Sequence, residues 1–194
     1  MIHGDGPLAE AIRAHAGDTA WCWIAYDEYD HDQIAATIRA ENPKLVILST
    51  PVPVGTCRRL EGEFYQPDFA VVPENIRTAT ATHDWTHQPF CVLGARRPQP
   101  YLRSYLGRIT STVIEMEPES AEMAKLALNG WLATQIEYAN EIGRVCEQVG
   151  ANPFVVMGAV ANEPRKYLKP GGPPGAHLMR DVRRLRELGF GLTL

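Results

Sequence analysis

Apolar runs of strand length alternate with amphipathic segments along the first half of this 194-residue chain. Residues 21–26 are rich in aromatic and β-branched side chains, and residues 45–48 are entirely apolar. Residues 7–16 and 33–40 instead place their apolar positions along one side of a helix. Strands without polar interruption that alternate with helices are typical of a parallel sheet covered on both faces. The pattern therefore predicts an α/β fold with a parallel sheet.

A different pattern begins near residue 118, where apolar residues recur at helical steps of three, four or seven. Before this point, three further apolar runs predict strands at residues 69–73, 90–94 and 109–114. The helical spacing predicts one long amphipathic helix over 119–150, ended by a glycine. A shorter helix is expected from Asn152, followed by a loop rich in proline and glycine at 162–176 and a basic helix over 178–188.

The composition argues against nucleic acid, metal ions and membranes as binding partners. Lys and Arg number 19 against 23 Asp and Glu, which gives a formal charge of -4, so binding to nucleic acid through a basic surface is not expected. The four cysteines lie far apart and form no C-x-x-C pair, so we expect reduced thiols and no metal site. No apolar stretch has the length of a membrane span and no signal start opens the chain, so a cytoplasmic location without membrane contact is expected.

A glycine-rich turn opens the chain as a candidate phosphate site. Gly4, Gly6 and Ala9 give the form G-x-G-x-x-A, which can bring backbone amides and a helix N-terminus against a pyrophosphate. The acidic residue that such a site needs must follow a second strand, and here Asp27 and Glu28 follow residues 21–26. A plain glycine turn is the equal alternative.

The long helix carries a polar pair. Lys125 and Asn129 are four residues apart, so they project from the same face one turn from each other. An ammonium beside a carboxamide can hold an oxyanion or a water molecule. The alternative is two polar residues on a solvated helix face.

Several ordered motifs resemble one enzyme family. Residues 49–56 (STPVPVGT) resemble its S-T-V-P-x-G-T turn after a strand, and residues 72–77 (VPENIR) resemble its N-P-E-F-L-R segment. Residues 119–149 resemble its central-domain helix, while 167–171 and 175–181 resemble its F-L-x-P-G and G-S-C-F-P-K-D segments. By these motifs the chain resembles the UDP-glucose/GDP-mannose dehydrogenase family.

The resemblance implies a fold, a reaction and a set of site residues. It implies a reduced Rossmann-like domain over 1–115 and a helical central and dimerisation domain over 116–194. Members of the family oxidise a nucleotide-linked hexose twice at carbon C6 with NAD. The catalytic positions carried over are Thr50, Glu74, Lys125, Asn129 and Asp181, with His177 at the place of the nucleophilic cysteine. The cofactor positions are Gly4, Gly6, Ala9, Ser49 and Thr50. The substrate positions are Asn75, Ile76, Arg77, Tyr167, Leu168, Gly171 and Gly175.

Several residues depart from the family pattern and change the expected reaction and cofactor binding. Because His177 cannot form a thiohemiacetal, the two-step oxidation by the usual route is expected to be absent. Pro173 and Pro174 stand in the glycine-rich substrate loop, where they restrict the backbone. Between residues 16 and 21 there is no room for the family's second and third strands, so weak or absent NAD binding is expected. The chain ends at Leu194, before the place of the family's second Rossmann-like domain.

Three functions remain open from the sequence. The favoured one is a dehydrogenase-like protein that performs at most one NAD-dependent hydride transfer on a sugar nucleotide. The alternatives are a catalytically degenerate protein that binds sugar nucleotides or serves as a dimeric scaffold, and non-redox sugar-nucleotide chemistry that uses His177 and Lys125. The helix over 119–150, with Trp131, carries more apolar residues than one sheet domain needs, so a homodimer through it is expected.

Overall fold

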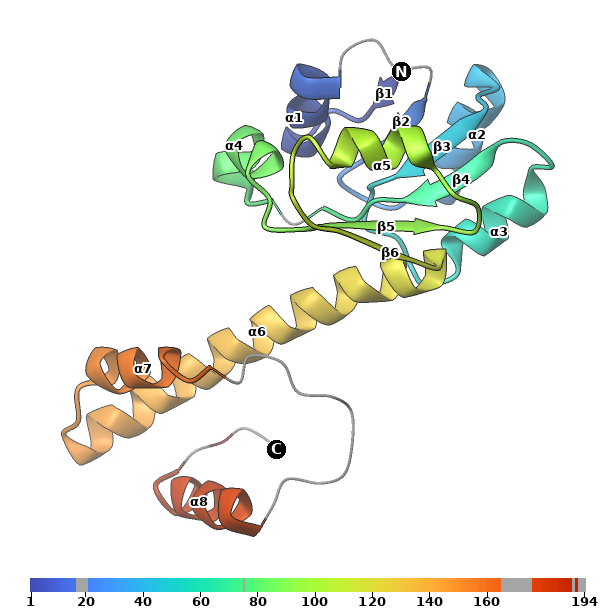
Figure 1. Ribbon diagram of the computed structural model, residues 1–194. Coiled ribbons are helices and arrows are strands. Elements are labelled where there is room, and N and C mark those ends of the chain that lie inside the picture. The colour runs from blue at the N-terminus through green and yellow to red at the C-terminus, as the bar shows by residue number, and fades with distance from the viewer. Residues whose placement is uncertain (17–20, 75, 165–175, 190, 192–194) are drawn as a thin grey trace. The chain divides into compact units, whose positions relative to one another are not determined.

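The computed structural model describes residues 1–16, 21–74, 76–164, 176–189 and 191 (Figure 1). Two compact units make up the chain, Met1–Leu128 and Asn129–Leu194. The division between the units falls inside the long helix α6 (Pro118–Val149). In the described residues no helix has the length and apolar character needed to cross a membrane.

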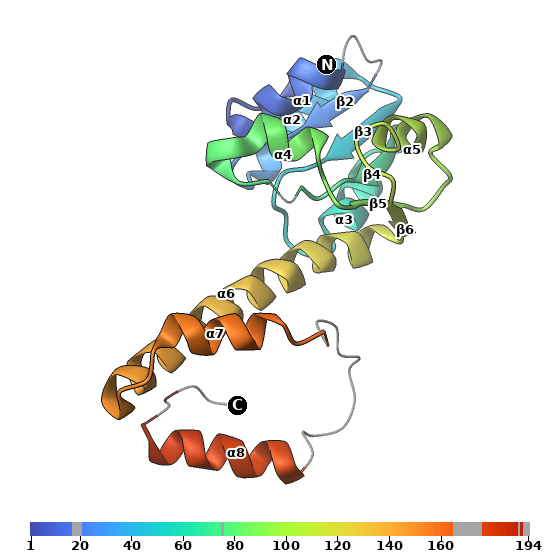
Figure 2. The ribbon, with the colours of Figure 1, turned by 60° about the vertical axis from the view of Figure 1, so that its left-hand side comes forward.

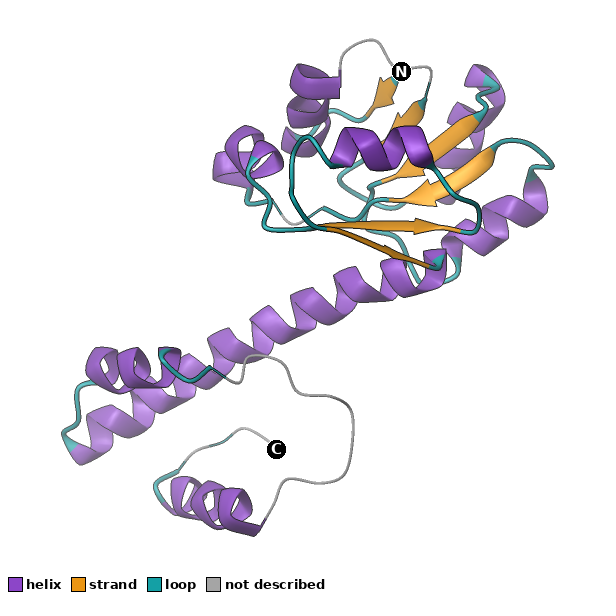
Figure 3. Cartoon of the chain, in the orientation of Figure 1, coloured by secondary structure: helices purple, strands orange, loops and turns teal. Residues whose placement is uncertain are grey.

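A six-stranded sheet forms the centre of Met1–Leu128 (Figure 3). Its strands are β1 (Ile2–His3), β2 (Cys22–Ile24), β3 (Leu45–Leu48), β4 (Asp68–Val71), β5 (Cys91–Ala95) and β6 (Val113–Met116). They lie side by side in chain order, with β1 at one edge. All neighbouring pairs are parallel except β4 and β5, which are antiparallel. The α/β class is confirmed, and the all-parallel sheet is corrected to a mostly parallel one.

Successive strand residues face opposite sides of the sheet, which explains why the central strands β2 and β3 are apolar throughout. Trp23 and Ile47 belong to one buried cluster, and their chain neighbours Ile24 and Leu48 belong to another. The first cluster is covered by α1 (Pro7–Ala16), α4 (Ala81–Thr86) and α5 (Pro100–Leu106). The second is covered by α2 (His31–Glu41), α3 (Thr56–Glu63) and the start of α6.

The first two crossover connections have opposite hands. Strands β1, β2 and β3 follow one another in one direction across the sheet, yet α1 and α2 cover opposite faces. Since parallel crossovers are nearly always right-handed, such a reversal is unusual.

Helix ends follow local chemistry. Asp30 caps α2, where its Oδ1 accepts hydrogen bonds from the backbone N–H groups of Asp32 and Gln33. Asn42 ends the same helix with a φ of 44°.

The strand predicted at 109–114 begins later in the structure. Ile109 N–H donates to Leu106 in the turn after α5, so β6 starts only at Val113.

The unit Asn129–Leu194 is helical (Figure 2). It contains most of α6, then α7 (Pro153–Ala161) and α8 (Ala176–Glu187). Ile142, Val145 and Cys146 on α6 are buried under Val156 and Met157 of α7 and neighbouring side chains. This small cluster is the apolar centre that the structure describes for the unit.

Candidate functional site

Two hydroxyl residues follow β3 at the carboxyl edge of the sheet. Ser49 and Thr50 are both buried. The Ser49 hydroxyl donates to the Val72 carbonyl at 2.6 Å and accepts from the Trp23 indole N–H at 2.8 Å. The Thr50 hydroxyl accepts from the Tyr26 backbone N–H at 2.8 Å. Both predicted cofactor residues therefore hold neighbouring strand ends together.

Glu74 and Lys125 meet although 51 positions separate them in the sequence. Glu74 follows β4, and Lys125 lies in the part of α6 that belongs to Met1–Leu128. Lys125 Nζ lies 3.1 Å from Glu74 Oε1 and donates to the Glu74 carbonyl at 2.6 Å. The two side chains are only 14% and 13% exposed. The structure thus brings together one predicted cation and one predicted carboxylate in a largely shielded ion pair.

The other predicted residues near this pair differ in their contacts. The second carboxylate oxygen of Glu74 accepts from the Ile76 backbone N–H at 2.7 Å, and the Ile76 side chain packs against the core. Asn129 lies one turn beyond Lys125 on α6 and is exposed. Thr50 makes its hydrogen bonds within the β2–β3 region instead.

Arg77 is held by a residue that sequence reasoning assigned no role. Its Nε and Nη2 both lie 2.9 Å from the carboxylate oxygens of Asp84, and its backbone N–H donates to the same carboxylate at 3.0 Å. Hydrogen bonds from Arg77 hold the pKa of Asp84 well below its usual range. The predicted substrate-binding guanidinium is therefore engaged in fixing the loop between β4 and α4.

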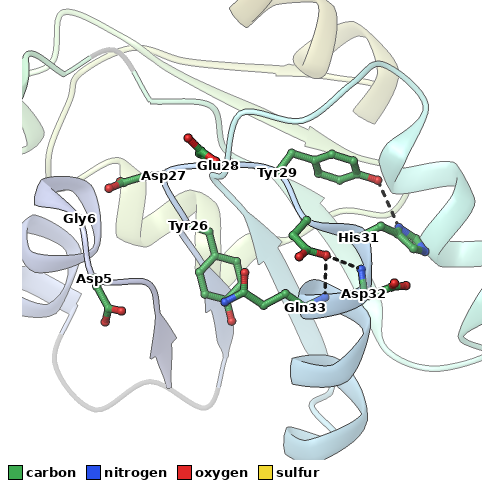
Figure 4. A pocket seen from close by; sticks show the side chains of 10 residues that line it. Asp5, Gly6, Tyr26, Asp27, Glu28, Tyr29, His31, Asp32 and Gln33 are labelled. Carbon is green, nitrogen blue, oxygen red and sulfur yellow. Dashed lines mark hydrogen bonds between the residues drawn. The ribbon is translucent and has the colours of Figure 1, made fainter.

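The glycine turn joins β1 to α1 as predicted (Figure 4). Gly4 has a φ of 135°, and a Cβ there would lie 2.2 Å from the Ala25 carbonyl oxygen, so glycine is required by the close approach of β2. A Cβ on Gly6 would lie 1.9 Å from Asp27 Oδ1. Ala9 is fully buried beneath the turn. The three residues thus build a tight turn with a carboxylate directly against it.

A pocket of about 650 Å³ opens beside this turn (Figure 4). Ten residues line it, and half of them are carboxylates: Asp5, Asp27, Glu28, Asp30 and Asp32. The lining includes no Lys or Arg. In the described part of the chain, no group of three or more His, Cys, Asp or Glu side chains is arranged to hold a metal ion.

These residues do not fit the pyrophosphate of a dinucleotide. The second glycine of such a turn normally leaves room for the phosphates, and here a carboxylate fills that room. A dense acidic segment at 27–32 was the sequence signal for this pocket.

Glu122 is a buried carboxylate that the sequence analysis did not single out. Its side-chain oxygens accept hydrogen bonds from the backbone N–H groups of Gly55, at 2.5 Å, and Cys57, at 2.7 Å. Burial raises its pKa, although these two hydrogen bonds oppose the shift. Glu122 thereby joins α6 to the N-terminus of α3, because Gly55 has no side chain to cap that helix.

The structure does not describe the side chains of several predicted site residues. Asn75, Tyr167, Leu168, Gly171 and Gly175 lie outside the described residues. His177 and Asp181 belong to α8, but their side chains are likewise outside the description. Their proposed roles stay predictions.

Comparison with known proteins gives a consistent family. The sequence model of the UDP-glucose/GDP-mannose dehydrogenase family, central domain, matches residues 119–190. A UDP-glucose 6-dehydrogenase of Bacillus subtilis is 30% identical over 158 residues, which cover 75% of this chain and 34% of that protein. A GDP-mannose 6-dehydrogenase of Pseudomonas syringae pv. tomato is 31% identical over 95% of this chain and 49% of that protein.

Solved structures agree with this family in fold. A crystal structure of a ternary complex of GDP-mannose dehydrogenase from Pseudomonas aeruginosa has a TM-score of 0.72 at 23% identity, covering 94% of this chain and 50% of that one. A UDP-glucose dehydrogenase from Pyrobaculum islandicum has a TM-score of 0.62 at 25% identity, covering 80% and 41%. The chain spans about a third to a half of the length of these relatives.

Proposed function

The chain belongs to the UDP-glucose/GDP-mannose dehydrogenase family, and from this premise we propose that it binds a nucleotide sugar beside the Glu74–Lys125 pair without completing the family's oxidation. The relatives are named as 6-dehydrogenases of UDP-glucose and GDP-mannose. A nucleotide-linked hexose is therefore the ligand class that the family suggests for this chain.

The Glu74–Lys125 ion pair is the observation that carries the proposal. Lys125 uses two donors on Glu74, and an ammonium has three. The Glu74 carboxylate accepts from Lys125 and Ile76 and has further acceptor capacity. Hydroxyl groups both donate and accept hydrogen bonds, so a donor and an acceptor held side by side suit a sugar. Partial shielding from water strengthens such contacts.

Two features support binding rather than oxidation. By resemblance, His177 stands where the family has its nucleophilic cysteine, so the thioester route has no nucleophile. The carboxylate against Gly6 and the acidic pocket beside it do not suit a dinucleotide. The proposed function therefore involves no hydride transfer.

A single oxidation of the sugar alcohol is the second candidate. The retained Glu74–Lys125 pair favours it, because a carboxylate and an ammonium could receive a proton and stabilise an alkoxide. Mixing the protein with NAD and either UDP-glucose or GDP-mannose would reveal this activity as absorbance of reduced nicotinamide. A nucleotide sugar that binds without producing this absorbance would support the binding function.

The central experiment titrates the protein with UDP-glucose and with GDP-mannose by calorimetry. Lys125→Ala should weaken binding by about ten- to a hundredfold, since a hydrogen bond to a charged group contributes about 1.5–3 kcal/mol. Arg103→Ala is the matched control, because it removes one positive charge from an ion pair with Glu115 elsewhere in the same unit. Its affinity should equal that of the unmodified protein.

Two outcomes would contradict the proposal. One is unmodified protein that binds neither nucleotide sugar, and the other is Lys125→Ala with undiminished affinity. Because Lys125→Ala leaves a shielded carboxylate without its partner, Glu74→Gln serves as a second variant that removes the carboxylate charge. It should weaken binding as well, and because its amide oxygen can still accept a hydrogen bond from Lys125, circular dichroism should show a folded protein.

Homodimerisation through α6 is part of the same proposal. Several apolar side chains of Asn129–Leu194 are exposed, namely Trp131, Leu132 and Ile136 on α6 and Phe154 and Val155 on α7. Leu132 and Ile136 are four residues apart and share one helix face. Large exposed apolar groups of this kind mark interaction surfaces, and the family resemblance assigns dimerisation to this helix. The occupant we propose is a second copy of the chain.

A further inference from the structure

We propose that Asp27 is a built-in anion of the glycine turn, whose carboxylate takes the place of a dinucleotide pyrophosphate and prevents NAD or NADH from binding there. This proposal is independent of the Glu74–Lys125 pair. It concerns only the turn between β1 and α1 and the acidic pocket beside it.

The contact at Gly6 is the first step. In a G-x-G-x-x-A turn, the second glycine has no side chain so that the backbone can approach the pyrophosphate. At Gly6 the missing Cβ would lie 1.9 Å from Asp27 Oδ1 and 2.4 Å from both Cγ and Oδ2. Gly6 is not among the glycines with positive φ. The Asp27 carboxylate therefore occupies the space beside Gly6.

The sheet topology explains how Asp27 reaches this place. Strand β2 is the direct neighbour of β1, with His3 paired to Ile24. The Ala25 backbone N–H then donates to the His3 carbonyl at 2.8 Å. The residues that follow β2 are thereby brought over the turn that follows β1. At the start of α1 the partial positive charge of the helix favours the Asp27 carboxylate.

Charge in the surrounding pocket acts in the same direction. Asp5, Glu28, Asp30 and Asp32 line it together with Asp27, and no Lys or Arg lines it. Like charges repel one another, so a further anion is disfavoured among these carboxylates. If the exposed Asp27 side chain rotated away, it would still lie among these carboxylates. A pyrophosphate would then enter a site whose lining has five carboxylates and one basic side chain, His31, and the Arg13 guanidinium beside the turn already donates to the Gly4 carbonyl.

A ribose-binding role for Asp27 would predict the opposite effect on NADH binding. A carboxylate that follows the second strand of a dinucleotide-binding fold accepts a hydrogen bond from the adenosine ribose. In that role Asp27 would promote NADH binding, and its removal would weaken it. The blocking role is favoured because Asp27 lies against Gly6 itself, the glycine at which the backbone of such a turn approaches the pyrophosphate.

The test titrates three forms of the full chain with inorganic pyrophosphate and with NADH. The forms are the unmodified protein, Asp27→Ala, and the matched control Glu28→Ala, which removes one charge from the same pocket without touching Gly6. The unmodified protein and Glu28→Ala should show no saturation with either ligand up to millimolar concentration. Asp27→Ala should bind pyrophosphate at least ten times more tightly than the control.

Either of two results would overturn the proposal. NADH that saturates the unmodified protein and binds Asp27→Ala more weakly would establish the ribose-binding role. Pyrophosphate binding by Asp27→Ala that equals that of Glu28→Ala would show that the carboxylate does not fill the phosphate position. Asp27 is exposed, so its replacement should preserve the fold, and circular dichroism would verify this.

Discussion

Carboxylates lie at three helix N-termini of the sheet unit, and one of them is Asp30, the cap of α2. Asp27 lies against Gly6 at the start of α1, and Glu122 accepts hydrogen bonds from Gly55 and Cys57 at the start of α3. Helix N-termini attract anions because their first N–H groups lack partners and carry a partial positive charge. At α2 and α3, Asp30 and Glu122 provide this anion through hydrogen bonds from backbone N–H groups.

Buried thiols give a prediction at the residue scale. Burial raises the pKa of Cys22 and of Cys91 to about 11, from an ordinary value of 9.0. Between pH 9 and 11 the unfolded chain loses these protons while the folded chain keeps them, so the free energy of unfolding should fall as pH rises. Chemical denaturation across this range measures the fall. Cys91→Ala should show a shallower fall than the unmodified protein, and an identical pH dependence would contradict the account.

Site residues could be predicted where a motif fixed their position. Glu74 and Lys125 belong to ordered motifs, and the structure joins them. The role of Asp84 could not be foreseen, because its partnership with Arg77 depends on how the loop after β4 folds back. For the same reason, Asp27 could be recognised as an acid after a strand, but its contact with Gly6 depends on which strands are neighbours.

At the scale of elements, Glu122 should be the principal link between α6 and α3. Glu122→Ala removes the acceptor of two backbone N–H groups, so the free energy of unfolding should fall by about 1–3 kcal/mol. Glu122→Gln should cost less, because its amide oxygen can still accept. Urea denaturation gives these values, with Glu115→Ala as the control.

The Glu115→Ala control separates the loss of the two buried hydrogen bonds to Glu122 from the loss of a negative charge. Glu115 forms an exposed ion pair with Arg103, and such pairs contribute about 0–1 kcal/mol. Equal stability of Glu122→Ala and Glu115→Ala would show that Glu122 does not anchor α3.

The apolar runs predicted the strands, but not how the chain connects them. In β2 and β3 every residue is buried, on both faces of the sheet, so the uninterrupted apolar runs identified these strands directly. The helices α4 and α5 have only six and seven residues, too few for a clear helical repeat, and α3 is strongly polar. Strand β5 runs antiparallel to β4 after the short connection through α4. The apolar pattern of a strand does not show in which direction the strand runs.

At the scale of the whole molecule, the helical unit exposes apolar side chains that a second copy would cover. Light scattering at micromolar concentration should give twice the chain mass of 21.5 kDa. Ile136→Asp should yield the monomer, because Ile136 is 61% exposed on α6 and a charge there would be buried on association. Tyr101→Asp, at a side chain 83% exposed on α5, should remain dimeric. A monomeric mass for the unmodified protein would exclude this interface.

In this family member a nucleotide sugar should bind while the glycine turn takes no dinucleotide. Calorimetric titration of the unmodified full chain with UDP-glucose, GDP-mannose and NADH in one buffer tests it most directly. We expect saturable heat from at least one nucleotide sugar and none from NADH up to millimolar concentration. Saturable NADH binding, or the absence of binding by both nucleotide sugars, would contradict it.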